Sequence, residues 1–335
     1  MPVYSGAALV PAARRIVETV LAVQAGEKVC IVTDTERPAV IAEALMGAGV
    51  SSGAEVVVVV MLPRDMGGVE PPDVVRAAME AADAVILQTS YALTHTNAAR
   101  AILGNHGRFV DMWGCTEEML LHGGMTANYD WVRDVTVELS RQAAEAAEMR
   151  LTTPDGTNLR FDVRGRTIVS LVGSATQAGS FCALPDGEMA VSPLEGSAEG
   201  VLVDPFVIER RGIEWPKDPI RVSFEDGIVT RIEGGQEAQE LDALLATTPP
   251  SAKNLAEFAI GTNPACRIGV TMRENKKALT TAHIAIGDNR SLGGVVDSPL
   301  HIDMIVKRPT VTFDGRVVLD DGKLLVADAM DVPVG

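Results

Sequence analysis

An alternation between strand-length apolar runs and helical stretches is the feature that most constrains the fold of this chain. Strands that are apolar along their whole length are buried on both faces, and helices between such strands favour a parallel sheet. The pattern therefore predicts a doubly wound parallel α/β domain over residues 1–128. The expected buried strands are residues 29–32, 55–61, 84–87 and 108–111, and the expected helices are residues 7–23, 38–49, 71–82 and 95–103.

The pattern of apolar and polar residues changes after a helical stretch at residues 129–149. Short runs of alternating apolar and polar residues follow, and they are separated by Asp-Gly steps, which are typical of β-hairpins in that setting. Residues 129–335 are therefore predicted to form an α+β domain rich in antiparallel strands, with one clear helix at residues 236–245. The expected hairpin turns contain residues 155–156, 226–227, 314–315 and 321–322.

Charge and composition exclude several classes of partner. The formal net charge is −16 at pH 7, which opposes a nucleic-acid partner because phosphate binding needs a basic surface. No apolar run approaches the roughly eighteen residues that a membrane span needs, and no leader pattern is visible, so we expect a cytoplasmic protein without a membrane partner. The four cysteines lack pair or metal spacing and indicate small buried side chains in a reducing compartment.

The carboxyl ends of parallel strands are where open α/β sheets bind ligands. Residues 33–35 and 88–96 are expected at that edge, and the second segment contains His95. This histidine either acts as an acid or base in a cleft or belongs to the start of a helix. No Gly-x-Gly-x-x-Gly or Gly-x-x-x-x-Gly-Lys-Ser/Thr motif is present, so no motif supports nucleotide binding.

The triplet His301-Ile302-Asp303 is the sharpest local signal for chemistry in the second domain. Side chains at i and i+2 of a strand point to the same face, so His301 and Asp303 would project together. Two interpretations remain open for this pair alone: a neutral histidine bonded to its aspartate, or two ligands of one metal. His283, Glu257 and Glu188 favour the metal, because each also lies in mainly apolar sequence.

A buried carboxylate without a partner normally becomes neutral, whereas a divalent metal keeps it ionised. Three carboxylates with two imidazoles exceed what a closed structural zinc site needs. They suit a pair of metals that turns water into a nucleophile. The proposed ligands are Glu188, Glu257, His283, His301 and Asp303.

These segments together resemble the aminopeptidase T family of metallopeptidases. Their order and spacing match across the whole second half of the chain. The first half is also similar, through residues 93–96 and 114–119. The segments that carry the resemblance in the second half are Leu184-Pro-Asp-Gly-Glu188, Glu257-Phe-Ala-Ile-Gly-Thr-Asn-Pro264, His283-Ile-Ala-Ile-Gly-Asp-Asn289 and His301-Ile-Asp303.

The resemblance implies a two-domain, metal-dependent hydrolase that forms a homodimer. It implies a pair of Zn, Co or Mn ions on the five matching ligands, and Glu274 is a weaker match to a further acidic residue. The peptidases also have a catalytic tyrosine shortly after the residue that matches His283. Residues 288–291 read Asp-Asn-Arg-Ser here, so that tyrosine is missing.

The same superfamily contains 2,5-dihydroxypyridine 5,6-dioxygenase, an Fe(II) enzyme that opens a pyridine ring. That enzyme keeps the pair matching His301 and Asp303 and uses a histidine resembling His95 near its substrate. It has histidine where this chain has Glu257, and it lacks a histidine matching His283. Because a carboxylate-rich set suits a hydrolytic metal pair, the sequence ranks hydrolase ahead of dioxygenase.

The leading hypothesis is therefore a metallohydrolase that acts on an amide or peptide-like small molecule through a metal-activated water. Glu257 would be general base as well as ligand, because apolar surroundings can raise the basicity of a carboxylate. His95 would bind substrate from the first domain, in a cleft between the domains. The alternatives are an Fe(II)-dependent dioxygenase acting on a hydroxypyridine-type substrate, and a protein in which the metal serves only stability or binding.

Overall fold

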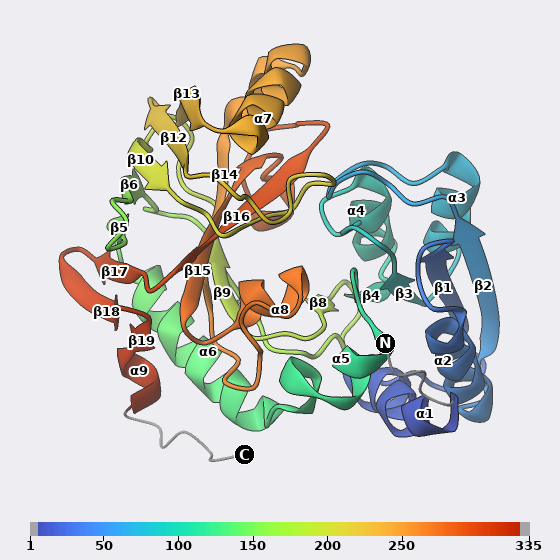
Figure 1. Ribbon diagram of the computed structural model, residues 1–335. Helices are drawn as coiled ribbons and strands as arrows, with labels where there is room; N and C mark the ends of the chain where they lie inside the picture. Colours follow the sequence, from blue (N-terminus) through green and yellow to red (C-terminus); the bar gives the residue numbers. More distant parts are fainter. Residues whose placement is uncertain (1–5, 329–335) are drawn as a thin grey trace. The chain divides into compact units, whose positions relative to one another are not determined.

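The computed structural model describes residues 6–328, and the chain divides into two compact units (Figure 1). The first unit takes the chain up to Ala127 together with Val172–Asp186, and the second takes Asn128–Leu171 and the chain from Gly187 onwards. The chain first passes from one unit to the other at residues 127–128, and the segment 172–186 returns to the first unit. The division into domains at residues 128–129 that the sequence suggests remains a prediction.

The first unit contains a five-stranded parallel sheet in the order β2-β1-β3-β4-β8. Helices connect the strands, which confirms the doubly wound α/β prediction. Residues of α3 and α4 pack against the sheet face that carries Cys30, Val85 and Leu87. The strands are β1 Lys28–Asp34, β2 Glu55–Met61, β3 Ala84–Gln88, β4 Arg108–Asp111 and β8 Phe181–Ala183; the helices are α1 Gly6–Arg14, the π-helical η1 Arg15–Val20, α2 Ala39–Ser51, α3 Asp73–Glu80, α4 Asn97–Gly104, α5 Glu117–Leu121 and the 3₁₀ turn η2 Gly123–Thr126.

Strand β2 was predicted to be buried, and that prediction is wrong. It lies at the edge of the sheet, beside β1 alone among the described strands. As a result Val57 is 50% exposed and Val60 is 61% exposed. An apolar run has the same appearance in an edge strand as in a central one, so the sequence pattern did not distinguish them.

The returning segment 172–186 supplies β8, the last strand of this sheet. Its Phe181 pairs in register with Phe109 of β4, and the two rings stack with centroids 5.1 Å apart. The backbone amide of Leu184 donates to the carbonyl of Asp111, which continues the contact beyond the strand. Three residues of strand are too short to be recognised from periodicity alone.

The second unit contains two mainly antiparallel sheets. One has eight strands in the order β13-β12-β10-β6-β5-β17-β18-β19, and the other has six in the order β11-β16-β15-β14-β9-β7. All four predicted Asp-Gly hairpins are confirmed by antiparallel pairing. The strands are β5 Glu148–Thr152, β6 Asn158–Asp162, β7 Ile168–Leu171, β9 Glu188–Val191, β10 Glu199–Val203, β11 Val207–Ile208, β12 Ile220–Glu225, β13 Ile228–Gly234, β14 Leu255–Gly261, β15 Thr281–Gly287, β16 His301–Lys307, β17 Thr310–Phe313, β18 Arg316–Asp320 and β19 Lys323–Leu324.

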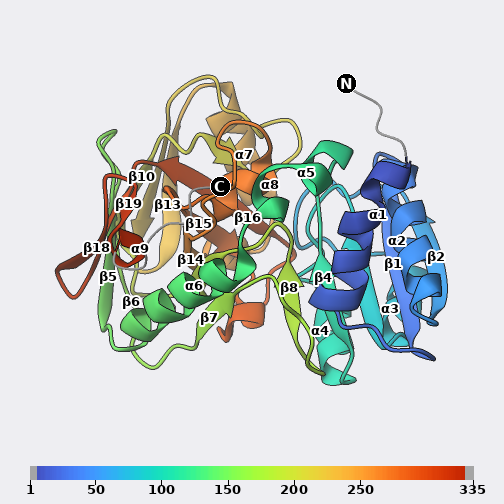
Figure 2. The same ribbon diagram turned by 90° about the horizontal axis from the view of Figure 1, so that it is seen from below.

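The six-stranded sheet is covered on the face opposite its acidic residues. Phe258 of β14 meets Phe161 of the eight-stranded sheet, with ring centroids 5.0 Å apart. Helix α6 packs beside β7 (Figure 2). The hydroxyl of Ser170 in β7 donates to the hydroxyl of Ser140 in α6 at 2.7 Å. The helices of this unit are α6 Tyr129–Ala144, α7 Gln236–Thr247, α8 Met272–Lys277 and α9 Leu325–Asp328, with 3₁₀ turns η3 Pro250–Lys253 and η4 Arg290–Leu292.

Helix α6 ends at Ala144, five residues before the predicted end at Met149. The carboxylate of Asp314 accepts hydrogen bonds from the backbone amides of Ala147 and Glu148, which turns the chain into β5. The predicted helix at residues 236–245 is confirmed as α7. A carboxylate from a hairpin 166 or 167 residues away fixes the end of α6, and no local pattern reveals it.

All four cysteines are free thiols, in agreement with the expectation of no disulfide. Cys30, Cys115 and Cys182 are buried, whereas Cys266 is only half-buried. Burial raises the pKa of the Cys30 thiol to about 11. Within residues 6–328, no helix is both long enough and apolar enough to cross a bilayer.

We predict that Glu27→Gln lowers the free energy of unfolding by about 1–2 kcal/mol at pH 7. Arg108 donates to both carboxylate oxygens of Glu27, at 2.9 and 2.7 Å, and these bonds lower the pKa of Glu27. The stabilisation is therefore present above the ordinary carboxyl pKa and is lost as the pH falls through the lowered value. Urea unfolding of both proteins at pH 7 and pH 3 checks this, with exposed Glu55→Gln as control; a difference that does not change with pH would contradict it.

A buried carboxylate and imidazole cluster

The candidate site lies on one face of the six-stranded sheet. Glu257 is in register with Ala285, and Ala285 with Asp303, so these residues form one row across β14, β15 and β16. His301 lies two residues before Asp303 and therefore shares its face. His283 and Glu188 lie on the same face, opposite Ala259 and Gly261 respectively.

A β-bulge in β14 determines which way Glu257 points. Leu255 pairs with Ile286 and Glu257 pairs with Ala285, so β14 has one extra residue at this position. Without that residue Glu257 would pair with Ile284 and project from the opposite, apolar face. The bulge is therefore a requirement of the site.

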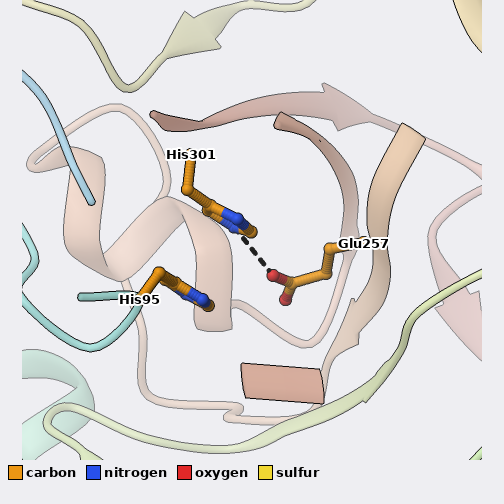
Figure 3. Close-up of side chains that lie close together, drawn as sticks. All are labelled: His95, Glu257 and His301. Atoms are coloured by element: carbon orange, nitrogen blue, oxygen red, sulfur yellow. Dashed lines mark hydrogen bonds and ion pairs between the residues drawn. The ribbon is translucent and has the colours of Figure 1, made fainter. Parts of the chain in front are cut away.

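The carboxylate of Glu257 lies between two imidazoles. Its Oε1 is 3.5 Å from Nε2 of His283, and its Oε2 is 3.0 Å from Nε2 of His301. Figure 3 shows the contact between Glu257 and His301 as a dashed line. All three side chains are almost inaccessible to solvent, with relative exposures of 3%, 0% and 2% for the residues in that order. The site is therefore buried and densely charged.

His301 is held in an orientation that suits a metal ligand. Its Nδ1 is 2.7 Å from the backbone carbonyl of Asp288. Because a carbonyl can only accept, Nδ1 carries a proton. A protonated Nε2 donates to the carboxylates of Glu257 and Asp303, whereas in the neutral ring the same atom would offer its lone pair to a metal ion between them. Nε2 is 3.1 Å from Oδ1 of Asp303. This is the arrangement by which proteins fix the tautomer of ligating histidines.

Two lysines from α8 and one more carboxylate complete the cluster. Lys277 Nζ is 2.8 Å from Oε1 of Glu188. Lys276 Nζ contacts Oδ2 of Asp303 and is 3.6 Å from Oε2 of Glu209, which follows β11. These residues were not expected in the site from the sequence, because a pair of lysines before an apolar strand ordinarily indicates a solvated turn.

A glycine allows the lysines to reach this face. A Cβ atom on Gly261 would lie 2.2 Å from the carbonyl oxygen of Ala278, the residue after α8. The end of α8 is then fixed by a hydrogen bond from the amide of Asn263 to the carbonyl of Lys277, and by Thr281, whose hydroxyl donates to Asn275. Gly261 thus lets the backbone of α8 lie directly on the sheet.

Charges within the cluster determine its ionisation. Burial by itself would raise the pKa of Glu257, but its contacts with the imidazoles of His283 and His301 outweigh burial and hold that pKa well below its ordinary value. The expectation that apolar surroundings raise the basicity of Glu257 is therefore wrong for this arrangement. Burial would lower the pKa of His301, yet Asp303 and Glu257 raise it to about 10. Burial and the charge of Asp303 raise the pKa of Glu209.

The donor set fits a divalent metal. Oε2 of Glu188 and both ring nitrogens of His283 are buried without a hydrogen-bond partner among the described residues. Ligand atoms of Glu188, Glu257 and His283 all lie within 4.8 Å of one another. Buried polar atoms without partners are costly, and coordination to an ion would satisfy them. Glu257, His301 and Asp303 offer a second, adjoining set of donors.

All five ligands expected from the sequence come together on this face, although their roles remain predictions. His95 belongs to the other unit, in the loop between β3 and α4, directly before Thr96, whose side chain caps the helix. Its proposed role in substrate binding also remains a prediction. Glu274 is buried, and its carboxylate pairs with Arg267 at 3.0 Å, so it is already neutralised.

Comparisons with known proteins identify a family whose sequence model matches this chain and solved structures that share its fold. A sequence model of the 2,5-dihydroxypyridine 5,6-dioxygenase family, NicX, matches residues 10–326. The solved 2,5-dihydroxypyridine dioxygenase of Pseudomonas putida KT2440 is 20% identical with a TM-score of 0.82, and the alignment covers 97% of this chain and 98% of that one. Wild-type AmpT of Thermus thermophilus is 15% identical with a TM-score of 0.66, over 95% and 99% of the two chains. A search of curated proteins gave no match.

These two solved structures have the same fold as this chain, and both groups are those that the sequence resembles. At identities of 20% and 15%, these two similarities show that the fold is shared and nothing about activity. The match to the family model is stronger evidence than the shared fold, because it is a match of sequence and spans nearly the whole chain. It favours the dioxygenase alternative over the hydrolase that the sequence analysis ranked first.

We predict that Gly261→Ala destabilises the second unit by about 1–3 kcal/mol and weakens metal binding, because the new methyl group must displace backbone at the end of α8. Gly104→Ala in α4 is the matched control, since a Cβ there meets nothing within 4 Å. Thermal unfolding and titration with Mn²⁺ measure both effects. Equal stability and equal Mn²⁺ affinity in the two variants would show that the close approach of α8 is unimportant.

Proposed function

Because the chain belongs to the 2,5-dihydroxypyridine 5,6-dioxygenase family, we propose that it is a metal-dependent dioxygenase that opens a hydroxypyridine-type ring. The match over residues 10–326 includes every residue of the buried cluster. The single observation that carries the proposal is His301, whose Nε2 meets the carboxylates of both Glu257 and Asp303. Non-haem Fe(II) oxygenases commonly use two imidazoles and one carboxylate. Here His283 and His301 supply two imidazoles, and Glu257 and Asp303 supply one carboxylate more than that set.

Fe(II) is the ion that this proposal requires, and when bound it supplies redox chemistry with dioxygen. Glu257, His301 and Asp303 would hold it, with His283 as a further imidazole next to Glu257. The rest of the site acts through these donors. The carbonyl of Asp288 keeps the proton of His301 on Nδ1, and Lys276 orients Asp303 through Oδ2. Deep burial keeps bulk water away from the donors.

Hydrolysis by a metal pair is the second candidate, and a specific observation favours it. Glu188, Glu257 and His283 form their own compact group of donors, beside the group of His301 and Asp303. Two adjoining donor sets are what a two-metal hydrolase needs. The substrate would then be an amide or peptide-like small molecule, and the ions Zn, Co or Mn. The homodimer and the cytoplasmic location expected from the sequence remain proposals.

We predict oxygen consumption by the Fe(II)-loaded protein with 2,5-dihydroxypyridine, matched by loss of the ultraviolet absorbance of the ring. The protein is purified and loaded without oxygen, and an oxygen electrode follows the reaction. His301→Ala and Asp303→Asn should reduce turnover to background because each removes a donor, whereas the exposed Lys217→Met should leave it unchanged. Absence of oxygen uptake across a panel of hydroxypyridines would contradict the dioxygenase proposal.

Glu188→Gln separates the two candidates in the same preparation. A hydrolytic metal pair loses a ligand in this variant, so cleavage of an amide substrate by the Zn-, Co- or Mn-loaded protein should disappear. Ring opening depends on the other donor set, so oxygen uptake should change much less. Oxygen-independent cleavage that requires Glu188 would favour hydrolysis over dioxygenation.

A further inference from the structure

Two buried cations from α8 lie inside the acidic cluster, and neither is needed to hold a metal. Lys276 and Lys277 are 6% and 1% exposed. Each neutralises a different candidate ligand: Lys277 contacts Glu188, and Lys276 contacts Asp303. A buried lysine is rare unless it is paired, so the presence of two adjacent ones in a proposed metal site calls for an explanation.

The charges of the cluster are unequal. Its carboxylates are those of Glu188, Glu209, Glu257 and Asp303, and its ammonium groups are the two lysines. With both imidazoles neutral, as metal ligands are, two negative charges remain in excess. Two neighbouring arginines are paired with acids outside this set, Arg267 with Glu274 and Arg290 with both Asp288 and Asp297. The remaining charge equals that of one divalent ion.

We propose that Lys276 and Lys277 restrict this site to a single divalent ion. Their ammonium groups already neutralise the carboxylate charge that a second ion would otherwise neutralise. The inference deepens the proposed function, because it assigns one ion to a site with enough donors for two. A second ion would leave two positive charges in excess among almost fully buried side chains, which is strongly unfavourable. If Glu209 is neutral, the excess is larger still.

The contacts indicate how the restriction operates. Lys277 bonds Oε1 of Glu188 and leaves only Oε2 toward His283, at 3.6 Å from Nε2. Lys276 bridges Asp303 and Glu209, two acids that would otherwise repel each other. Hydrogen bonds to the backbone carbonyls of Lys277 and Asn275 fix the end of α8 on the sheet. The ammonium groups are buried there and lie within the site.

Metal stoichiometry tests the proposal directly. The metal-free full-length protein is titrated with Mn²⁺ in a calorimeter, and bound manganese is measured after gel filtration. We expect one Mn²⁺ per chain for the natural protein. Lys276→Met and Lys277→Met should each bind a second Mn²⁺, because each variant restores a negative charge. Their melting temperatures should continue to rise up to two equivalents, whereas that of the natural protein should stop rising at one.

Matched variants distinguish the effect of a lost lysine charge on the number of bound ions from the effect of a damaged fold. Lys277→Arg keeps the charge and should bind one ion, as should the surface variant Lys217→Met. Glu188→Gln combined with Lys277→Met removes a carboxylate together with its lysine, and it should return the count to one. Two ions bound by the natural protein would overturn the proposal without any variant. So would folded Lys276→Met and Lys277→Met proteins that both saturate at one ion.

The outcome is also distinct from failure of the proposed function. One bound Mn²⁺ together with no oxygen uptake by the Fe(II)-loaded protein would reject the dioxygenase and leave this inference standing. Binding of no ion at all by the natural protein would overturn both.

Discussion

The carboxylate of Glu257, enclosed between the imidazoles of His283 and His301, is the interaction on which the rest of the site depends. A charge buried this deeply must be compensated, and several separate features of the fold do so. The bulge in β14 turns Glu257 to this face, the carbonyl of Asp288 fixes the ring of His301, and Gly261 admits the end of α8. Each feature is costly or unusual alone, and together they make an acidic, buried and preorganised cluster.

Much of this architecture could be predicted because it follows from local periodicity. Continuous apolar runs gave the parallel sheet of the first unit, and Asp-Gly steps gave the four hairpins of the second. The i, i+2 spacing of His301 and Asp303 placed both on one face, and the cost of burying isolated acids pointed to Glu188 and Glu257. These inferences need only the chain's own spacing.

The remainder depends on contacts between distant residues. The return of segment 172–186 to the first unit, the exposed edge at β2 and the end of α6 are all determined by tertiary neighbours. The low pKa of Glu257 reverses the expectation from its apolar sequence, because the two histidines that cause it lie on other strands. Lys276 and Lys277 carry no sequence signal of their own, because they are buried at the place where α8 packs closely against Gly261.

The central claim is that these acids and imidazoles coordinate a divalent ion. X-ray absorption at the iron edge of the Fe(II)-loaded protein examines it most directly, because scattering from imidazole rings beyond the first shell is distinctive. The account predicts a first shell of nitrogen and oxygen with imidazole scattering that weakens in His301→Ala, and no sulfur. A spectrum of oxygen ligands alone, unchanged in that variant, would contradict it.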